Sequence, residues 1–238
     1  MDYRKEYEKW LASPALSEDE RAELRALEGN DKEIKARFYG PLEFGTAGLR
    51  GTMYTGLHNM NRHVIRWATQ GFANVIRAEG TEAMQKGVAV CMDCRNHSAE
   101  FARETACVMA ANGIHVRLFE SLRPTPELSF AVREYGCQAG VNVTASHNPK
   151  EYNGYKVYWS DGAQLPPQHA AAIADELTRI DIFTGVQSMD YEQALAEGRI
   201  ELLGEDCDRR FMANVMGMVN DYETVKKVAD DFGLVYSP

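Results

Sequence analysis

Short apolar runs alternate with helical periods over most of this 238-residue chain. Apolar residues that recur every three to four positions predict helices, and these lie at about 62–78, 98–111 and 126–134. Short apolar runs bounded by turn residues predict strands, and these lie at 42–45, 88–92, 115–119 and 139–143. Such alternation is typical of an α/β fold, a layered domain with a mixed, largely parallel sheet flanked by helices.

The two ends of the chain differ from this central pattern. Residues 1–40 predict charged amphipathic helices, and Ser17 with Glu20 matches a capping box. Beyond the central pattern the sequence predicts further elements, namely a helix from Pro166 or Pro167 to about 180, a strand at 200–203, helical segments at 209–219 and 222–232, and a strand-like stretch at 234–236. We therefore predict an N-terminal helical extension (1–40), an α/β domain (41–205), and linker helices with the truncated start of a second α/β domain (206–238).

Charge and cysteine content narrow the function classes. A formal net charge of −9 and a pI of about 5.2 disfavour binding to nucleic acid or to an anionic membrane. No apolar core of a signal peptide follows Met1, and the five cysteines indicate reduced thiols. We expect a soluble, cytoplasmic protein. Cys91 and Cys94 form a C-x-x-C without a second ligand pair, so we interpret them as ordinary cysteines near a strand end.

The segment Thr144–Pro149 carries the clearest chemical signal. It directly follows the apolar strand at 139–143, so Ser146 is expected to be both exposed and fixed in a turn that Asn148 and Pro149 support. Neighbouring residues of an extended chain point to opposite sides, which predicts that His147 cannot act as a base on the Ser146 hydroxyl. A G-x-S-x-G elbow is also absent.

A serine without a dedicated base can still carry a phosphoryl group, because phosphoserine already holds the group to be transferred and needs positive charge around it. Asn153–Gly154 is predicted to form a turn that returns an extended segment, 154–159, alongside the serine loop. Lys156 is then a candidate cation or proton relay. The alternative is a capped surface turn at Ser146 with a solvated Lys156.

The segment Phe44–Gly51 is a second candidate for ligand binding. Its three glycines allow a close backbone approach, and Arg50 offers a bidentate fork for phosphate. The P-loop pattern is absent. Taken alone, the segment fits a tight strand-to-loop transition with an exposed arginine equally well.

Together the two segments resemble the α-D-phosphohexomutase family, in its phosphoglucomutase and phosphopentomutase branch. The resemblance covers essentially the whole chain and includes several further motifs, namely Asn61–Arg62, Asp93–Cys94–Arg95, Pro124–Thr125–Pro126 and Ala47 within the glycine segment.

The resemblance implies a phosphoglucomutase that interconverts glucose 1-phosphate and glucose 6-phosphate through a bound glucose 1,6-bisphosphate. Ser146 would be the catalytic phosphoserine, and its phosphate would bind Mg²⁺. Arg50, His147 and Lys156 match positions near the reacting groups, with Arg50, Ser146 and Lys156 binding the phosphosugar substrate.

The family's three metal-binding aspartates form an Asp-Gly-Asp-x-Asp-Arg loop, which the nearest string, 204–209, does not match. We interpret that string as a linker and helix start with Asp206 or Asp208 as the N-cap. The remaining metal ligands are therefore expected beyond residue 238, which would leave the fragment catalytically incomplete.

Several alternatives remain open at this point. The nearest alternative to a phosphoglucomutase is a phosphopentomutase or a phosphomannomutase of the same family. A different class is a non-catalytic phosphosugar-binding module. A serine phosphatase or hydrolase lacks support, since neither a base nor a complete metal set is visible. An unpaired tail strand is expected to promote dimers of the fragment.

Overall fold

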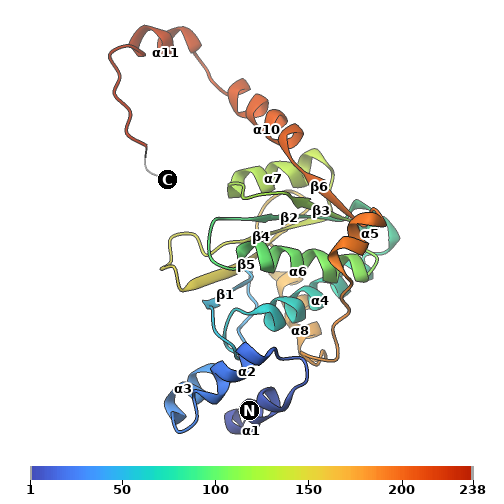
Figure 1. The fold of residues 1–238 in the computed structure, drawn as a ribbon. Helices are drawn as coiled ribbons and strands as arrows, with labels where there is room; N and C mark the ends of the chain where they lie inside the picture. The colour runs from blue at the N-terminus through green and yellow to red at the C-terminus, as the bar shows by residue number, and fades with distance from the viewer. Residues whose placement is uncertain (1, 237–238) are drawn as a thin grey trace. The chain divides into compact units, whose positions relative to one another are not determined.

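A computed structural model describes residues 2–236 and divides the chain into two compact units, Met1–Gly204 and Glu205–Pro238 (Figure 1). The helices of the first unit are α1 (Tyr3–Ala12), α2 (Glu18–Arg25), α3 (Asp31–Phe38), α4 (Arg62–Ala78), α5 (Thr81–Lys86), α6 (Ser98–Ala111), α7 (Thr125–Glu134), α8 (Pro167–Leu177) and α9 (Tyr191–Ala196). Its strands are β1 (Leu49–Thr52), β2 (Val88–Met92), β3 (Val116–Phe119), β4 (Ala139–Val143), β5 (Tyr152–Trp159) and β6 (Ile200–Leu203). The second unit contains α10 (Glu205–Gly217) and α11 (Tyr222–Val228).

The strands of the first unit form one six-stranded sheet in the order β1-β5-β4-β2-β3-β6. Strands β4, β2, β3 and β6 are parallel, whereas β5 runs antiparallel to both of its neighbours. Every residue of β2 and β4 is buried, as expected for parallel strands that are covered on both faces. The predicted α/β fold with a mixed, largely parallel sheet is confirmed.

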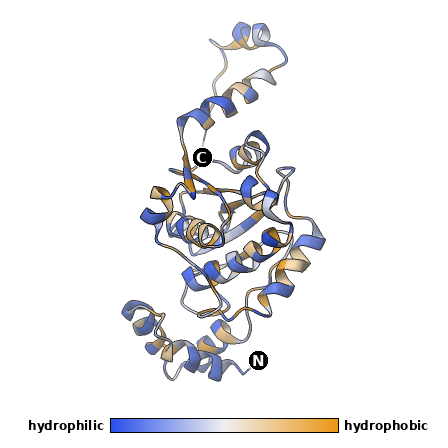
Figure 2. Ribbon diagram, turned by 90° about the vertical axis from the view of Figure 1, so that its right-hand side faces the viewer, coloured by the Kyte–Doolittle hydropathy of each residue, from blue (hydrophilic) through white to orange (hydrophobic). Residues whose placement is uncertain are grey.

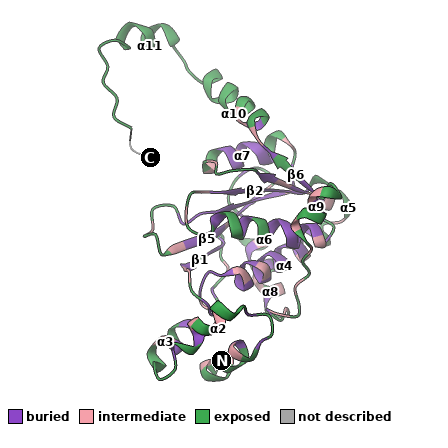
Figure 3. Ribbon diagram, in the orientation of Figure 1, coloured by how far each residue is buried: buried purple, intermediate pink, exposed green. Residues whose placement is uncertain are grey.

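Helices cover both faces of this sheet. Helix α7 packs on β2 and β4 from one face, and α6 packs on β2, β3 and β4 from the other (Figure 1). Helix α4 contacts both α6 and α8, so it is enclosed between helices, and most of its residues are buried. Hydrophilic and hydrophobic residues alternate around the helices (Figure 2), and the central strands β2 and β4 and the inner helix faces are buried (Figure 3). The predicted helices at 62–78 and 98–111 coincide with α4 and α6.

The N-terminal helices join the same hydrophobic core. Trp10 and Phe38 are fully buried, and the Trp10 ring lies edge-on to the rings of Phe38, His63 and Phe183. The predicted capping box is present, because the Ser17 side chain accepts from the Glu20 amide and the Glu20 carboxylate accepts from the Ser17 amide. Helix α2 therefore begins where the sequence predicts.

One strand prediction in the first unit is wrong. Residues 42–44 are irregular and Gly45 makes only an isolated bridge to Gly48, while the strand of this region is β1. The side chain of Leu42 is buried beside Gly51 instead of joining the sheet. Strand β1 owes its extended form to pairing with β5, a contact about a hundred residues away in the chain, which no local pattern of Leu49–Thr52 reveals.

The second unit is exposed almost throughout: helix α11 has no buried residue, and α10 has one, Cys207 (Figure 3). Residues 234–236 are not a strand, because no partner strand pairs with them in the part of the chain that is described. Helix α10 begins at Glu205, so neither Asp206 nor Asp208 is its N-cap. Across residues 2–236, no helix combines the length and the apolar character needed to cross a membrane.

Candidate functional site

The serine loop lies where two parallel strands end. Asp93 directly follows β2 and Thr144 directly follows β4, and the Asp93 amide donates to the Val143 carbonyl at 3.2 Å. Carboxyl ends of parallel strands meet at one edge of a sheet, which is where ligands bind in open α/β folds. The fold therefore brings residues 93–98 and 144–151 side by side.

Ser146 is exposed and adopts a left-handed backbone conformation, with φ at 56°. Such a conformation is unfavourable for a residue other than glycine and persists only when its surroundings fix it. Here the Ser146 amide donates to Thr144 Oγ1 at 3.0 Å, and its carbonyl accepts from Arg95 Nη2 at 2.7 Å. Ser146 is therefore both exposed and fixed in its turn, as the sequence predicts.

The prediction that His147 points away from the serine hydroxyl is wrong. Nδ1 of His147 lies 3.4 Å from Ser146 Oγ. Side chains alternate only along an extended chain, and the left-handed turn at Ser146 removes that alternation. The separation is longer than a good O–H hydrogen bond, so the pair is close without the geometry of a serine-histidine couple.

Lys156 lies on β5, opposite Asn142 of β4. The predicted turn at Asn153–Gly154 is wrong, because both residues lie inside β5, and the chain reverses through residues 144–151 instead. The neighbouring Tyr155 is fully buried, and its hydroxyl lies 3.0 Å from that of Thr69 on α4. This contact fixes the strand that carries Lys156.

Three charged side chains act on the Lys156 ammonium group. Partial burial lowers its pKa, and the positive charges of Arg50 and Arg95 lower it further, whereas Asp93 opposes the shift. The site is therefore electropositive although the chain is acidic overall. A local concentration of positive charge of this kind suits an anionic ligand.

Arg50 reaches the serine loop from the edge strand β1. Its Nη1 donates to Asn148 Oδ1 at 3.1 Å. The glycine segment before it packs tightly on β5: Gly48 has φ at 74°, and a Cβ there would lie 1.9 Å from the Tyr155 carbonyl oxygen. Only glycine permits this approach, and it brings Arg50 beside the loop that holds Ser146.

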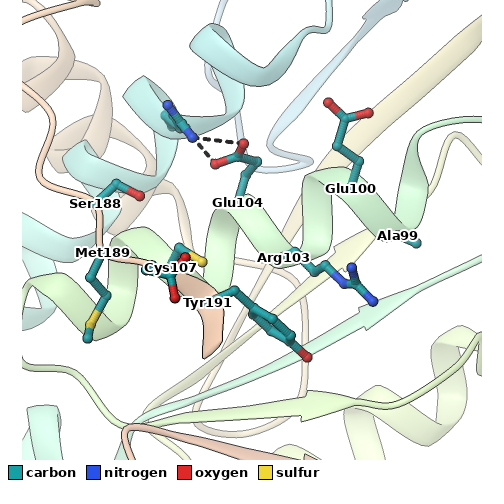
Figure 4. A pocket seen from close by; sticks show the side chains of 10 residues that line it. Ala99, Glu100, Arg103, Glu104, Cys107, Ser188, Met189 and Tyr191 are labelled. Carbon is teal, nitrogen blue, oxygen red and sulfur yellow. Dashed lines mark hydrogen bonds and ion pairs between the residues drawn. The ribbon is translucent and has the colours of Figure 1, made fainter. Parts of the chain in front are cut away.

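A cavity of about 400 Å³ opens beside the serine, and its lining residues come from the two loops, Asp93, Cys94, Arg95, Asn96, Ser146, Asn148 and Lys150. A larger hollow of about 550 Å³ lies elsewhere, between α4, α6 and residues 188–191 (Figure 4). Two of the charges that line it form an ion pair, since Arg66 Nε lies 2.5 Å from Glu104 Oε2. None of the four predicted site residues lines this larger hollow.

Comparison with known proteins decides the family. Residues 41–182 match the family described as phosphoglucomutase/phosphomannomutase, alpha/beta/alpha domain I. This chain belongs to that family. The match covers both the glycine segment and the serine loop, so it includes every residue of the site described above.

Individual relatives carry several names. A human phosphopentomutase is 41% identical over 156 residues, which is 63% of this chain and 26% of that protein. A phosphoglucomutase of Staphylococcus saprophyticus is 33% identical over 81% of this chain and 34% of its own length. A crystal structure of a putative phosphomannomutase from Thermus thermophilus has a TM-score of 0.56 at 27% identity, covering 69% of this chain and 33% of that one. The chain spans about a quarter to a third of the curated relatives named here.

The residues of this family member do not form a complete magnesium site. No group of three His, Cys, Asp or Glu residues that could hold a metal ion occurs between residues 2 and 236. Asp206 instead pairs with Arg209 and Arg210 along α10. Mg²⁺ typically takes carboxylate and phosphate oxygens, and a phosphate on Ser146 would supply only one partner of that kind.

Asp93 and Arg95 were not predicted as site residues, although both belong to a motif of the family resemblance. Arg95 donates to the Ser146 carbonyl, and Asp93 accepts from the buried Thr144 at the start of the serine loop. Their position in the sequence could have revealed them, since Asp93 and Thr144 each follow an apolar run predicted as a strand. Residues at the ends of adjacent parallel strands are expected to meet.

Proposed function

We propose that Ser146 is the phosphoryl carrier of a phosphosugar mutase. The observation that supports this most strongly is an exposed serine, held in a left-handed turn, with Arg50 and Lys156 of neighbouring strands beside its loop. Phosphoryl transfer depends chiefly on positioning and on positive charge around the moving group. A serine hydrolase would instead need a histidine base that a third side chain orients, and the one hydrogen bond described for the His147 side chain within residues 2–236 is the 3.4 Å contact with Ser146 Oγ.

The proposed reaction starts from phosphorylated Ser146. A sugar hydroxyl oxygen attacks the phosphorus, the bond between phosphorus and Ser146 Oγ breaks, and a sugar bisphosphate forms. In the second half, Ser146 Oγ attacks the other phosphate of that bisphosphate and the isomeric sugar monophosphate leaves. Arg50 binds phosphate oxygens, and Lys156 holds or delivers the proton that the sugar hydroxyl loses and regains.

Magnesium enters this proposal only as a family property. Phosphoryl transfer generally uses a metal to neutralise developing charge, and the described residues supply too few ligands for one. The steps above therefore concern only the side chains of this chain.

For the substrate we propose glucose 1-phosphate, with glucose 1,6-bisphosphate as the intermediate, in a protein located in the cytoplasm. A second candidate is a phosphopentose, because relatives from human and from Saccharomyces cerevisiae are named phosphopentomutase and phosphoribomutase. The substrate belongs to the whole protein that contains this sequence, since the chain matches only part of each relative's length.

The test is a mutase assay of the whole protein on glucose 1-phosphate and on ribose 1-phosphate, with and without Ser146→Ala. We expect conversion of glucose 1-phosphate, at least a thousandfold slower in the variant, since the carrier oxygen is missing. Faster conversion of ribose 1-phosphate selects the second candidate. Equal activity of wild type and Ser146→Ala refutes the carrier assignment.

A further inference from the structure

We propose that Arg95, Asp93 and Thr144 are positioning residues that hold Ser146 for phosphoryl transfer, and that Arg95 does not itself bind the phosphate. This inference rests on the proposed function of Ser146 as the carrier. It assigns different tasks to two arginines of the same electropositive site: Arg95 shapes the loop, and Arg50 receives the anion.

The Arg95 guanidinium donates four hydrogen bonds to the protein. Its Nη2 donates to the carbonyls of Ser146 and Asn148, both at 2.7 Å, and its Nη1 donates to those of Pro149 and Tyr152 at 2.9 and 3.0 Å. The remaining donor, Nε, faces Asp93 Oδ2 at 3.5 Å. A guanidinium has five N–H donors, so four are taken by loop carbonyls and the fifth faces the Asp93 carboxylate, which leaves Arg95 little capacity for a phosphate.

These four carbonyls extend from Ser146 to Tyr152, the first residue of β5. One planar group thus sets the distances between the carbonyls of residues 146, 148, 149 and 152. The Arg95 side chain is 13% exposed, and its contacts with the Asn148 and Tyr152 carbonyls are partly buried, so water weakens these two less. Lysine could not replace this fork, since its ammonium group has three donors on a flexible stem.

A second contact chain fixes the serine amide. Asp93 Oδ2 accepts from the Thr144 hydroxyl at 2.6 Å, and Thr144 Oγ1 in turn accepts from the Ser146 amide at 3.0 Å. The other carboxylate oxygen of Asp93 accepts from the Arg95 amide and from Ser98 Oγ. Because the Thr144 hydroxyl donates to a carboxylate, its lone pair faces the amide that needs it.

Arg50 contrasts with Arg95 in both exposure and pairing. It is exposed, and Asn148 Oδ1 is its one hydrogen-bond partner among the contacts described for residues 2–236. Most of its donors remain available to an anion beside Ser146. Replacing Arg50 should therefore weaken substrate binding, whereas replacing Arg95 should mainly disorder the loop and slow the transfer step.

The first experiment compares Thr144→Val with Thr144→Ser in the whole protein. Valine keeps the shape and removes the hydroxyl, and Thr178→Val, at the end of α8, is the matched control. Hydrogen exchange of peptides covering 144–152, followed by mass spectrometry, should accelerate about tenfold in Thr144→Val alone. We expect kcat for the mutase reaction to fall about 10- to 100-fold at nearly constant KM, and Thr144→Ser to restore most of it.

The second experiment compares Arg95→Ala with Arg50→Met. Added guanidinium chloride at millimolar concentration should recover part of the kcat of Arg95→Ala, because the free ion can occupy the same carbonyl cage, and Arg50→Met should mainly raise KM. Unchanged exchange at 144–152 in Thr144→Val, or an Arg95→Ala variant that raises KM as Arg50→Met does without losing kcat, overturns the proposal. Hydrogen exchange of residues 144–152 does not depend on mutase activity. It therefore tests the positioning of the loop separately from the Ser146→Ala assay, which tests whether Ser146 is the carrier.

Discussion

Glu20 of α2 ties the N-terminal helices to α4, and its removal should cost stability in a pH-dependent way. Its carboxylate accepts from the Ser17 amide at 2.7 Å and from Arg62 Nη2 at 2.8 Å, and it lies 3.2 Å from His63 Nε2. The side chain is 17% exposed. Glu20→Gln removes the charge while keeping a residue that also fits a capping box.

The size of the effect follows from the pKa of this carboxylate. Burial acts to raise the pKa of Glu20, but hydrogen bonds from His63, the Ser17 backbone and Arg62 outweigh burial and lower it from 4.5 to about 2. Since each pKa unit corresponds to about 1.4 kcal/mol, the ionised carboxylate stabilises the fold by about 3 kcal/mol. A depressed carboxylate pKa means that this contribution is present above pH 4.5 and is lost as the pH falls towards 2.

The assay is urea unfolding of wild type and Glu20→Gln at several pH values between 2 and 7. The difference in free energy of unfolding should be about 3 kcal/mol at pH 7 and should shrink steadily below pH 4.5. Glu18→Gln is the matched control, because Glu18 is on the same helix with its side chain 83% exposed, and should cost less than about 1 kcal/mol. A Glu20 difference that is small at pH 7, or that does not change with pH, refutes the reasoning.

Three further predictions concern the site and its surroundings. Gly48→Ala should lower the midpoint of thermal unfolding by several degrees, because its Cβ would overlap the Tyr155 carbonyl, and differential scanning calorimetry checks this. Arg50→Met should raise the pKa of Lys156 by removing a repulsive charge, which an NMR titration of the lysine ammonium group measures; an unchanged pKa would contradict the described proximity. Under native conditions a maleimide should label one cysteine rapidly, Cys94, and Cys94→Ser should abolish the fast phase, since the other four cysteines are buried.

The elements that the sequence predicts best are those whose local pattern of apolar residues is sufficient to identify them. Helices α4 and α6 carry an apolar face at helical spacing, and β2 and β4 are apolar runs that parallel strands require. Strand β1 escaped prediction because its four residues are extended only through pairing with β5. The short helix α5 was also not anticipated, and it has no side-chain cap to signal its start.

The site residues with a chemical signal in their own segment were predicted, whereas contacts that depend on the tertiary fold were not. Ser146, Arg50 and Lys156 belong to segments whose residue types suggest chemistry on their own, and the fold brings them to one edge of the sheet. The close approach of His147 was missed because it depends on a left-handed serine, which only the surrounding contacts enforce. Arg95 donates to backbone carbonyls about fifty residues away in the chain, and such contacts leave no pattern of side chains in the sequence.

In the proposed reaction Ser146 carries the phosphoryl group. The most direct measurement incubates the whole protein with glucose 1,6-bisphosphate labelled with ³²P in its phosphates, maps the labelled peptide, and then adds unlabelled glucose 1-phosphate. Label should appear on Ser146, pass to sugar during the chase and be absent from Ser146→Ala. Label on another residue, or equal labelling of Ser146→Ala, would show that Ser146 is not the carrier.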